Sequence, residues 1–318
     1  MTASAPALPE ARPFPRRPRP VPALVWALPP VAALGVAFLY PLALVVQQSF
    51  TSDSPTSDGG GASLDTWRQT LGSTAFRRAL VTTVEIALGS TAGCLLLGFL
   101  LALVIAFVPF PGARLFGRFI DVFVAFPSFL ITLALVFVYG TAGMANGAWQ
   151  DLTHSRQSPF DFLTTPWGVL LAEITYFTPF VMRPLLGAFS QVETAQIEAA
   201  CSLGARPWRI VRRVILPEAL PSLAAGGSLV LVMCLNEFGI VLFTGAKDVV
   251  TLPMLVYSRA ILESDYPAAC VVAVVNVVLS VALYGVYRAC VPASAKGAKS
   301  AKSAKSAGGI GGAGHAGG

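Results

Sequence analysis

Few residues in this sequence could carry out chemistry, and the most distinctive of them are polar side chains inside long apolar segments. Asn236 and Glu237 are adjacent, and Asn276 lies in the next apolar segment. A charged group at the centre of a membrane helix costs about 2.5–3.5 kcal/mol on insertion scales, so its presence needs an explanation. We predict that Asn236, Glu237 and Asn276 line a polar path for a solute. The alternative is that they form hydrogen bonds between helices.

The sequence motifs of an enzyme are missing. No G-x-x-x-x-G-K-[ST] phosphate loop occurs, and there is neither a nucleophile elbow nor a hydrolytic pair of carboxylates. The two histidines and five cysteines show no metal-ligand spacing. We therefore expect no catalytic residue, no metal and no cofactor in this chain. If transport uses ATP, a separate subunit must hydrolyse it.

The composition indicates a membrane protein. Of the 318 residues, 55% are hydrophobic and only 12% are charged, against about 25% charged in soluble domains. An apolar helix of about 20 residues crosses the hydrocarbon core. Six segments of the sequence fit: Ala23–Val46, Ala79–Val108, Phe119–Tyr139, Trp167–Phe189, Leu220–Phe243 and Ala268–Tyr287. The predicted fold class is an all-α membrane protein with six transmembrane helices.

The distribution of basic residues predicts the topology. The net charge is +6, but the lysines and arginines gather at the ends of apolar segments, which is a topology signal and not a nucleic-acid surface. Most of them fall on one side if both termini are cytoplasmic. The predicted divisions are a disordered basic arm (1–22), a retained first helix with a periplasmic loop (23–78), a transmembrane domain (79–291) and a disordered Lys/Ala/Gly-rich tail (292–318).

A short polar segment, Glu193–Pro217, lies between the fourth and fifth apolar segments. Its pattern predicts two short helices that fold back at Gly204, where glycine permits a left-handed backbone. Ala195, Ala199 and Leu203 should form an apolar face of the first helix. We expect Pro217 to end the second helix, with Trp208, Val211 and Ile215 on one face and Arg206, Arg209 and Arg213 on another.

The spacing Glu198-Ala199-Ala200, Gly204 and Leu216-Pro217 resembles the EAA loop of ABC-importer permeases, with Val214 where the family has isoleucine. The resemblance implies a MetI-like permease bundle, and it implies that Glu198, Ala199, Ala200, Gly204, Leu216 and Pro217 couple the chain to an ATPase. It also implies two copies of an ABC ATPase subunit, a second permease subunit that is identical or paralogous, and a periplasmic binding protein. The expected location is the bacterial inner membrane, in contact with lipids and not with nucleic acid.

Two further stretches concern the cargo. Asn236–Ile261 and Phe126–Gly140 resemble permeases of 2-aminoethylphosphonate importers. The resemblance implies phosphonate transport, and importers of polyamine, thiamine, iron or sulfate share much of the pattern. Two other classes stay open, an ion-gradient-driven secondary transporter and a membrane-embedded enzyme. The first would show broken helices near the midplane of the membrane, and the second a catalytic cluster at the end of a span.

Overall fold

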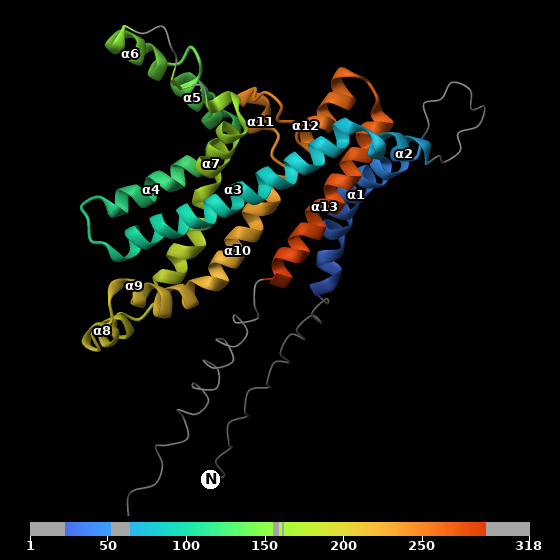
Figure 1. Cartoon of the computed structure of the whole chain (residues 1–318). Coiled ribbons are helices and arrows are strands. Elements are labelled where there is room, and N and C mark those ends of the chain that lie inside the picture. Colours follow the sequence, from blue (N-terminus) through green and yellow to red (C-terminus); the bar gives the residue numbers. More distant parts are fainter. Residues whose placement is uncertain (1–22, 52–63, 155–158, 161, 291–318) are drawn as a thin grey trace, which may run out of the picture. The chain divides into compact units, whose positions relative to one another are not determined.

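The computed structural model describes residues 23–51, 64–154, 159–160 and 162–290, and all of its regular elements are helices (Figure 1). Six segments of this described part are long and apolar enough to cross a membrane. The prediction of a six-span all-α protein is therefore confirmed. The predicted arm (1–22) and tail (292–318) lie outside the described residues.

The first helix, α1 (Ala23–Ser49), belongs largely to a unit of its own that ends at Val45. The helix is strongly apolar and contains Pro29, Pro30 and Pro41. Prolines are better tolerated in membrane helices than in soluble ones, because local adjustments can satisfy the carbonyl groups that they leave free.

Three helices form the core of the second unit, which starts at Val46. They are α3 (Thr74–Phe107), α7 (Pro166–Phe189) and α10 (Leu216–Leu235), and each packs extensively against the other two. Small residues allow this close approach. A Cβ at Gly93 of α3 would collide with Ile174 of α7, and one at Gly226 of α10 would lie 3.2 Å from Val181 Cα of α7. Small residues at helix contacts are typical of membrane bundles, in which packing drives association.

A second packed group joins α13 (Tyr266–Cys290), α12 (Leu252–Tyr257) and the start of α3. The Leu252 N–H donates to Thr83 Oγ1 at 2.8 Å, which ties α12 to α3. The short helix α2 (Asp65–Gly72) packs against α13 and α3.

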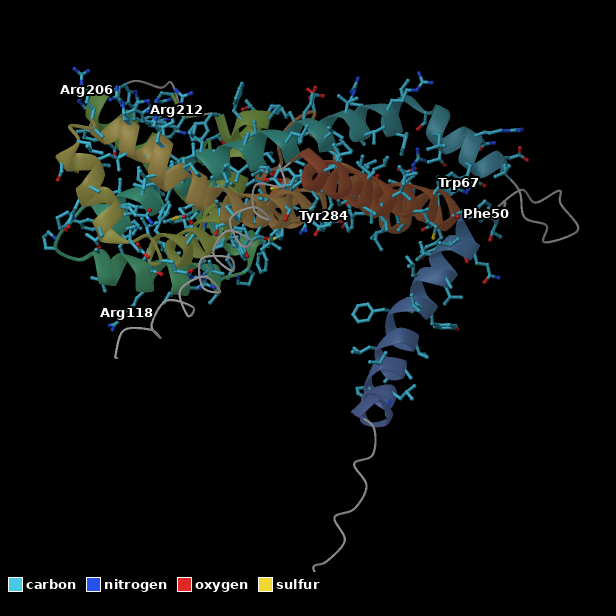
Figure 2. All side chains as sticks on the ribbon, turned by 90° about the horizontal axis from the view of Figure 1, so that it is seen from below. Phe50, Trp67, Arg118, Arg206, Arg212 and Tyr284 are labelled. Atoms are coloured by element: carbon cyan, nitrogen blue, oxygen red, sulfur yellow. The ribbon has the colours of Figure 1, made fainter. Side chains whose placement is uncertain are left out.

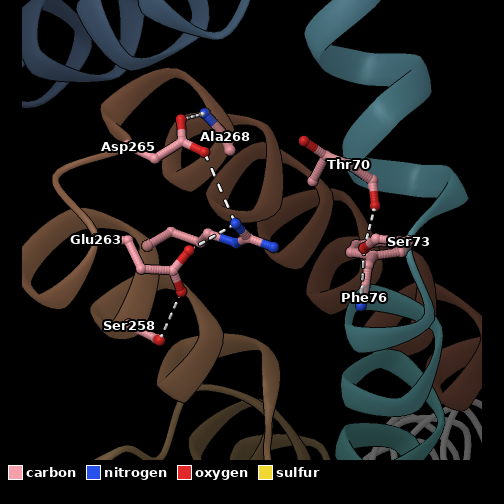
Figure 3. A network of polar contacts seen from close by, with 8 residues as sticks. Thr70, Ser73, Phe76, Ser258, Glu263, Asp265 and Ala268 are labelled. Atoms are coloured by element: carbon pink, nitrogen blue, oxygen red, sulfur yellow. Dashed lines mark hydrogen bonds and ion pairs between the residues drawn. The ribbon is translucent and has the colours of Figure 1, made fainter.

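Polar contacts order the turns at this end of the unit (Figure 3). Ser73 Oγ accepts from the Phe76 N–H at 3.2 Å and caps α3. A π-helical turn, Ser258–Leu262, precedes α13. Arg259 pairs with Glu263 at 2.7 Å, and Asp265 Oδ1 accepts from the Ala268 N–H at 3.1 Å in the first turn of α13.

The predicted third span is broken. In place of one helix over Phe119–Tyr139, the chain forms α4 (Ala113–Val124), a short irregular segment and α5 (Ser128–Tyr139). Pro127 explains the break, since its ring disfavours a helical backbone at the preceding residue and it lacks an N–H. After a turn comes α6 (Met144–Thr153), and the short η1 (Phe162–Thr164) precedes α7.

The fifth span also differs from the prediction. Pro217 does not end a helix, because α9 (Pro207–Ile210) continues through a π-helical turn, Val211–Ile215, into α10. The wider i to i+5 hydrogen bonding of this turn, with the Leu216 N–H donating to Val211 O, comes directly before the proline that cannot donate. At its other end α10 stops at Leu235, and α11 (Gly239–Thr244) begins after a break of three residues.

Within this unit the hairpin helices α8 (Thr194–Ser202) and α9 lie at one end, and α6, α11 and α12 lie toward the opposite end (Figure 1). The core helices run between these two ends. The two groups of residues singled out in the sequence therefore occupy different levels of one bundle: the hairpin lies at its tip, and the polar residues lie within it.

Candidate functional sites

The hairpin turns through a glycine-dependent cap. Gly204 has a φ of +74°, the left-handed value that glycine was predicted to supply. The Ala205 N–H donates to Ala200 O at 3.0 Å and the Gly204 N–H donates to Cys201 O at 2.9 Å. This pair of bonds is the Schellman arrangement, which satisfies carbonyl groups at the end of α8. Gly204 therefore fixes the angle between α8 and the chain that follows.

One side of the hairpin packs on the bundle and the other side is free. Ile197, Ala200 and Ala205 pack against the core, and Ile210 and Ile215 are part of it. The opposite side carries the predicted apolar face, and all three of its members are exposed: Ala195, Ala199 and Leu203. Leu203 is 88% exposed, a high value for a leucine on a folded unit. Glu198 is exposed as well.

Trp208 was predicted to share a face with Val211 and Ile215, and this is wrong. Its side chain is 73% exposed, whereas Ile210 and Ile215 are buried. The helix periodicity changes at the π-helical turn, so a face drawn with 3.6 residues per turn does not hold across it. Trp208 instead joins the exposed arginines of this segment, Arg206, Arg209, Arg212 and Arg213. Figure 2 shows Arg206 and Arg212 at the same end of the unit.

The second group of predicted residues forms a hydrogen-bonded link between α10 and α13. Asn276 Nδ2 donates to Asn236 Oδ1 at 3.1 Å, and Asn236 Nδ2 donates to Ser280 Oγ at 3.3 Å and to Val232 O at 2.8 Å. Asn276 is buried, whereas Asn236 is exposed. Interhelical hydrogen bonding, the alternative to a substrate path, therefore occurs here, and Asn236 is also accessible.

Glu237 joins the two helix breaks. Its Oε1 atom accepts from the Ser128 hydroxyl at 3.0 Å and from the Ile240 N–H at 3.0 Å. Ser128 begins α5 after the first break, and Ile240 lies in the first turn of α11 after the second. Gly239 keeps this junction tight, because a Cβ there would lie 3.3 Å from Glu237 Oε1 and 3.4 Å from Phe129 Cβ.

Helix lengths place this junction near the middle of the bundle. At 1.5 Å per residue, Asn276 lies roughly 15 Å along α13 from Tyr266, where the candidate span Tyr266–Ala289 begins. Half of a 30 Å hydrocarbon core is about 15 Å, and the hydrogen bond from Asn276 to Asn236 brings the junction to this level. Irregular backbone at this depth is tolerated where it is buried in protein or lines a water-filled cavity. We name Ser128, Asn236, Glu237, Asn276 and Ser280 the polar junction.

Two other acidic residues of the spans lie elsewhere. Glu173 of α7 is 1% exposed, and the side chains of Ser90 and Cys234 lie beside it at the contact of the three core helices. Its Oε2 atom has no hydrogen-bond partner within the described part of the chain. Glu85 is exposed on α3. Neither residue contributes a hydrogen bond to the polar junction.

Sequence reasoning missed Ser128 and Ser280. A serine in an apolar stretch is a weak signal, because its hydroxyl can bond to the carbonyl oxygen one turn earlier. The sequence did offer one clue to Ser128, its position directly after Pro127. Within the described residues, no group of three or more His, Cys, Asp and Glu side chains could hold a metal ion.

Comparison with known proteins shows to which family of membrane proteins the chain belongs. The model of the family described as binding-protein-dependent transport system inner membrane component matches residues 95–296. The chain therefore belongs to this family and is a multi-pass inner-membrane permease subunit of an ABC importer. This membership decides against the secondary transporter and the membrane enzyme that the sequence left open.

Within this family, the chain can be compared with individual relatives. The chain is 52% identical over 265 residues to a protein named as the 2-aminoethylphosphonate transport system permease PhnU of Salmonella paratyphi A, covering 83% of this chain and 90% of that one. The match to the protein of the same name from Salmonella typhimurium is also 52%, covering 83% and 91%. A sulfate transport system permease protein of Chlorella vulgaris is 32% identical over 65% of this chain and 75% of its own length.

A solved structure supports the fold. The chain superposes on a bacterial ABC transporter involved in import of the acidic polysaccharide alginate with a TM-score of 0.71, at 19% identity, covering 85% of this chain and 94% of that one. At this identity the likeness concerns the fold alone.

Proposed function

We propose that this chain is the permease subunit of an importer that moves 2-aminoethylphosphonate. The main support for this cargo is the 52% identity, over 83% of the chain, to relatives that are named for it. The sulfate permeases share far less of the sequence. The predicted resemblance of Phe126–Gly140 and Asn236–Ile261 to phosphonate permeases agrees with this. Both stretches contribute to the polar junction, which supplies Asn236, Glu237 and Asn276 as candidates for the path.

Uptake of labelled 2-aminoethylphosphonate by cells with and without this chain tests the cargo, with putrescine and thiamine as controls. We expect deletion to remove uptake of the phosphonate alone. Phosphonate uptake that is unchanged by deletion would reject this cargo and leave the fold and the family in place.

The hairpin is proposed as the contact with a separate ATPase subunit that hydrolyses ATP. Its free face of Ala195, Ala199 and Leu203 suits a helix that lies in a groove of a partner. Gly204 sets the angle of that face, and Leu216 and Pro217 lie where the hairpin passes into α10. Motion of the partner would therefore be transmitted directly to a core helix. Two ATPase copies, a second permease subunit and a periplasmic binding protein would complete the importer.

The hairpin end is proposed to face the cytoplasm, together with both termini. The support is the four exposed arginines of the hairpin and the excess of Lys and Arg on that side of the spans. Cys201 is an exposed cysteine of this hairpin, which allows a direct test. In a variant that keeps Cys201 alone, a membrane-impermeant maleimide should label inverted vesicles but not intact spheroplasts. Ser264→Cys at the opposite end should show the reverse, and the same pattern for both would contradict the orientation.

A further inference from the structure

Glu237 uses only one of its two carboxylate oxygens inside the protein. Both hydrogen bonds that it accepts, from Ser128 and from the Ile240 N–H, end on Oε1. Among the described residues no donor reaches Oε2, and no lysine or arginine forms an ion pair with this side chain. Glu237 is half-buried, so the carboxylate is not sealed inside the bundle. The two donors fix its orientation and leave Oε2 available.

The position of this carboxylate is unusual for a residue that has only a packing role. It lies at the meeting point of two helix breaks near mid-depth, beside the exposed Asn236. Ionisable side chains at this depth usually face a water-filled cavity or the bundle interior, where they pair or mark a solute pathway. Discontinuous helices near the midplane also form solute sites in other transporters, because the break exposes polar backbone groups.

We infer that Glu237 is a cargo-binding residue that accepts a hydrogen bond from an ammonium group through Oε2, and that Ser128 is the positioning residue that holds Oε1. This inference rests on the proposed transport function and adds the chemical class of the recognised group. A carboxylate attracts an ammonium and repels a purely anionic cargo such as sulfate. The amino end of 2-aminoethylphosphonate fits this requirement, and so would any other primary amine of similar size.

The test uses the complete importer in proteoliposomes, with its second permease subunit, ATPase and binding protein, and measures uptake of 2-aminoethylphosphonate against concentration. Glu237→Gln keeps an oxygen that can accept both internal bonds and removes the charge. We expect uptake at low cargo concentration to fall about 10- to 100-fold, the factor expected from losing one hydrogen bond to a charged group. Glu85→Gln, which changes an exposed glutamate of α3, is the matched control and should transport normally.

Ser128→Ala tests the positioning role without touching the carboxylate. It should raise the cargo concentration needed for half-maximal uptake several-fold, because Oε1 loses one of its two donors, and this change should exceed any change in the maximal rate of uptake. Ser128→Thr, which keeps the hydroxyl, should restore the half-maximal concentration. A general structural defect would instead lower the maximal rate and would not depend on the hydroxyl. If Glu237→Gln fails to accumulate, the comparison of Ser128→Ala with Ser128→Thr still tests whether the Glu237 carboxylate binds the cargo.

The outcomes separate the inference from the proposed cargo. If the unchanged importer moves 2-aminoethylphosphonate and Glu237→Gln does so equally well, the inference is overturned and the proposed function stands. If the unchanged importer does not move the phosphonate but moves putrescine, the cargo proposal fails. In that case loss of putrescine uptake in Glu237→Gln, but not in Glu85→Gln, still supports the ammonium site. Unchanged putrescine uptake in Glu237→Gln overturns it.

Discussion

At the scale of single residues, Gly204 and Gly187 form a matched pair that isolates backbone strain. A Cβ would meet nothing within 4 Å at either position, but only Gly204 has a positive φ. We therefore expect Gly204→Ala to strain the turn by about 1–2 kcal/mol and to reduce cargo-stimulated ATP hydrolysis, while membrane insertion stays normal. Gly187→Ala should behave as the unchanged protein. Normal coupling in Gly204→Ala and in a bulkier variant such as Gly204→Val would contradict the hairpin assignment.

Glu173 allows a second test at this scale, because its surroundings are fully protein. Glu173→Gln keeps the size of the side chain, and we expect the thermal stability of the purified protein to change little. Glu173→Lys places an ammonium among Ser90, Cys234 and apolar side chains, where burial costs several kcal/mol and Glu237 is the acidic group within electrostatic reach. That variant should fail to accumulate in the membrane. A stable Glu173→Lys protein would show that water or the Glu237 carboxylate compensates the buried charge.

At the scale of elements, the sequence predicted most helices well. The segments around α3, α7 and α13 were predicted correctly because long apolar runs with few charges indicate transmembrane helices. The breaks in the third and fifth spans were not predicted. A hydropathy pattern reports which residues are apolar, and it does not report where a helix is interrupted. Pro127 could have indicated the first break, whereas nothing in Asn236–Phe238 indicates the second without the contact to Ser128.

The polar junction shows the same limit. Asn236, Glu237 and Asn276 were identified because polar residues in apolar runs are conspicuous. Their partners Ser128 and Ser280 lie more than 40 residues away, at sequence separations of 109 and 44 for the two bonds concerned. Such pairings depend on how the helices pack, and one sequence does not contain that information. The sequence therefore identified Asn236, Glu237 and Asn276 but missed two hydroxyl groups, that of Ser128, which donates to Glu237, and that of Ser280, which accepts from Asn236.

The contact of α10 with α13 yields a prediction at this scale. A methyl group at position 227 would collide with the Tyr287 hydroxyl, so Gly227→Ala should force the two helices apart. Overpacking of this kind typically costs about 1–3 kcal/mol, and we expect a lower melting temperature. Gly285→Ala, which meets nothing within 4 Å, should not lower it. Adding Tyr287→Phe removes the nearest atom and should recover part of the loss. No recovery would place the strain elsewhere.

At the scale of the whole molecule, the second half of the hairpin (residues 206–215) carries exposed charges of one sign only, whereas the first half has the exposed Glu193 and Glu198. Arg206, Arg209, Arg212 and Arg213 are all exposed, and no ion pair involving them is found within the described part of the chain. A surface with one sign of charge favours a partner of the opposite sign and accelerates encounter more than it strengthens the final complex. The proposed ATPase partner should therefore present acidic residues around the groove that receives Ala199 and Leu203.

Charge reversal tests this complementarity. Arg209→Glu with Arg213→Glu should slow assembly with the ATPase about 10-fold or more at low salt, and the difference from the unchanged chain should shrink as salt screens the charges. Arg118→Glu changes an exposed arginine on α4, outside the hairpin (Figure 2), and should leave assembly unaffected. Association rates measured by surface-immobilised ATPase at several salt concentrations give the comparison. If both changes slow assembly equally, net charge and not the hairpin surface governs the encounter. If the hairpin change alone acts and is salt-dependent, the arginines direct the partner to the apolar face beside them.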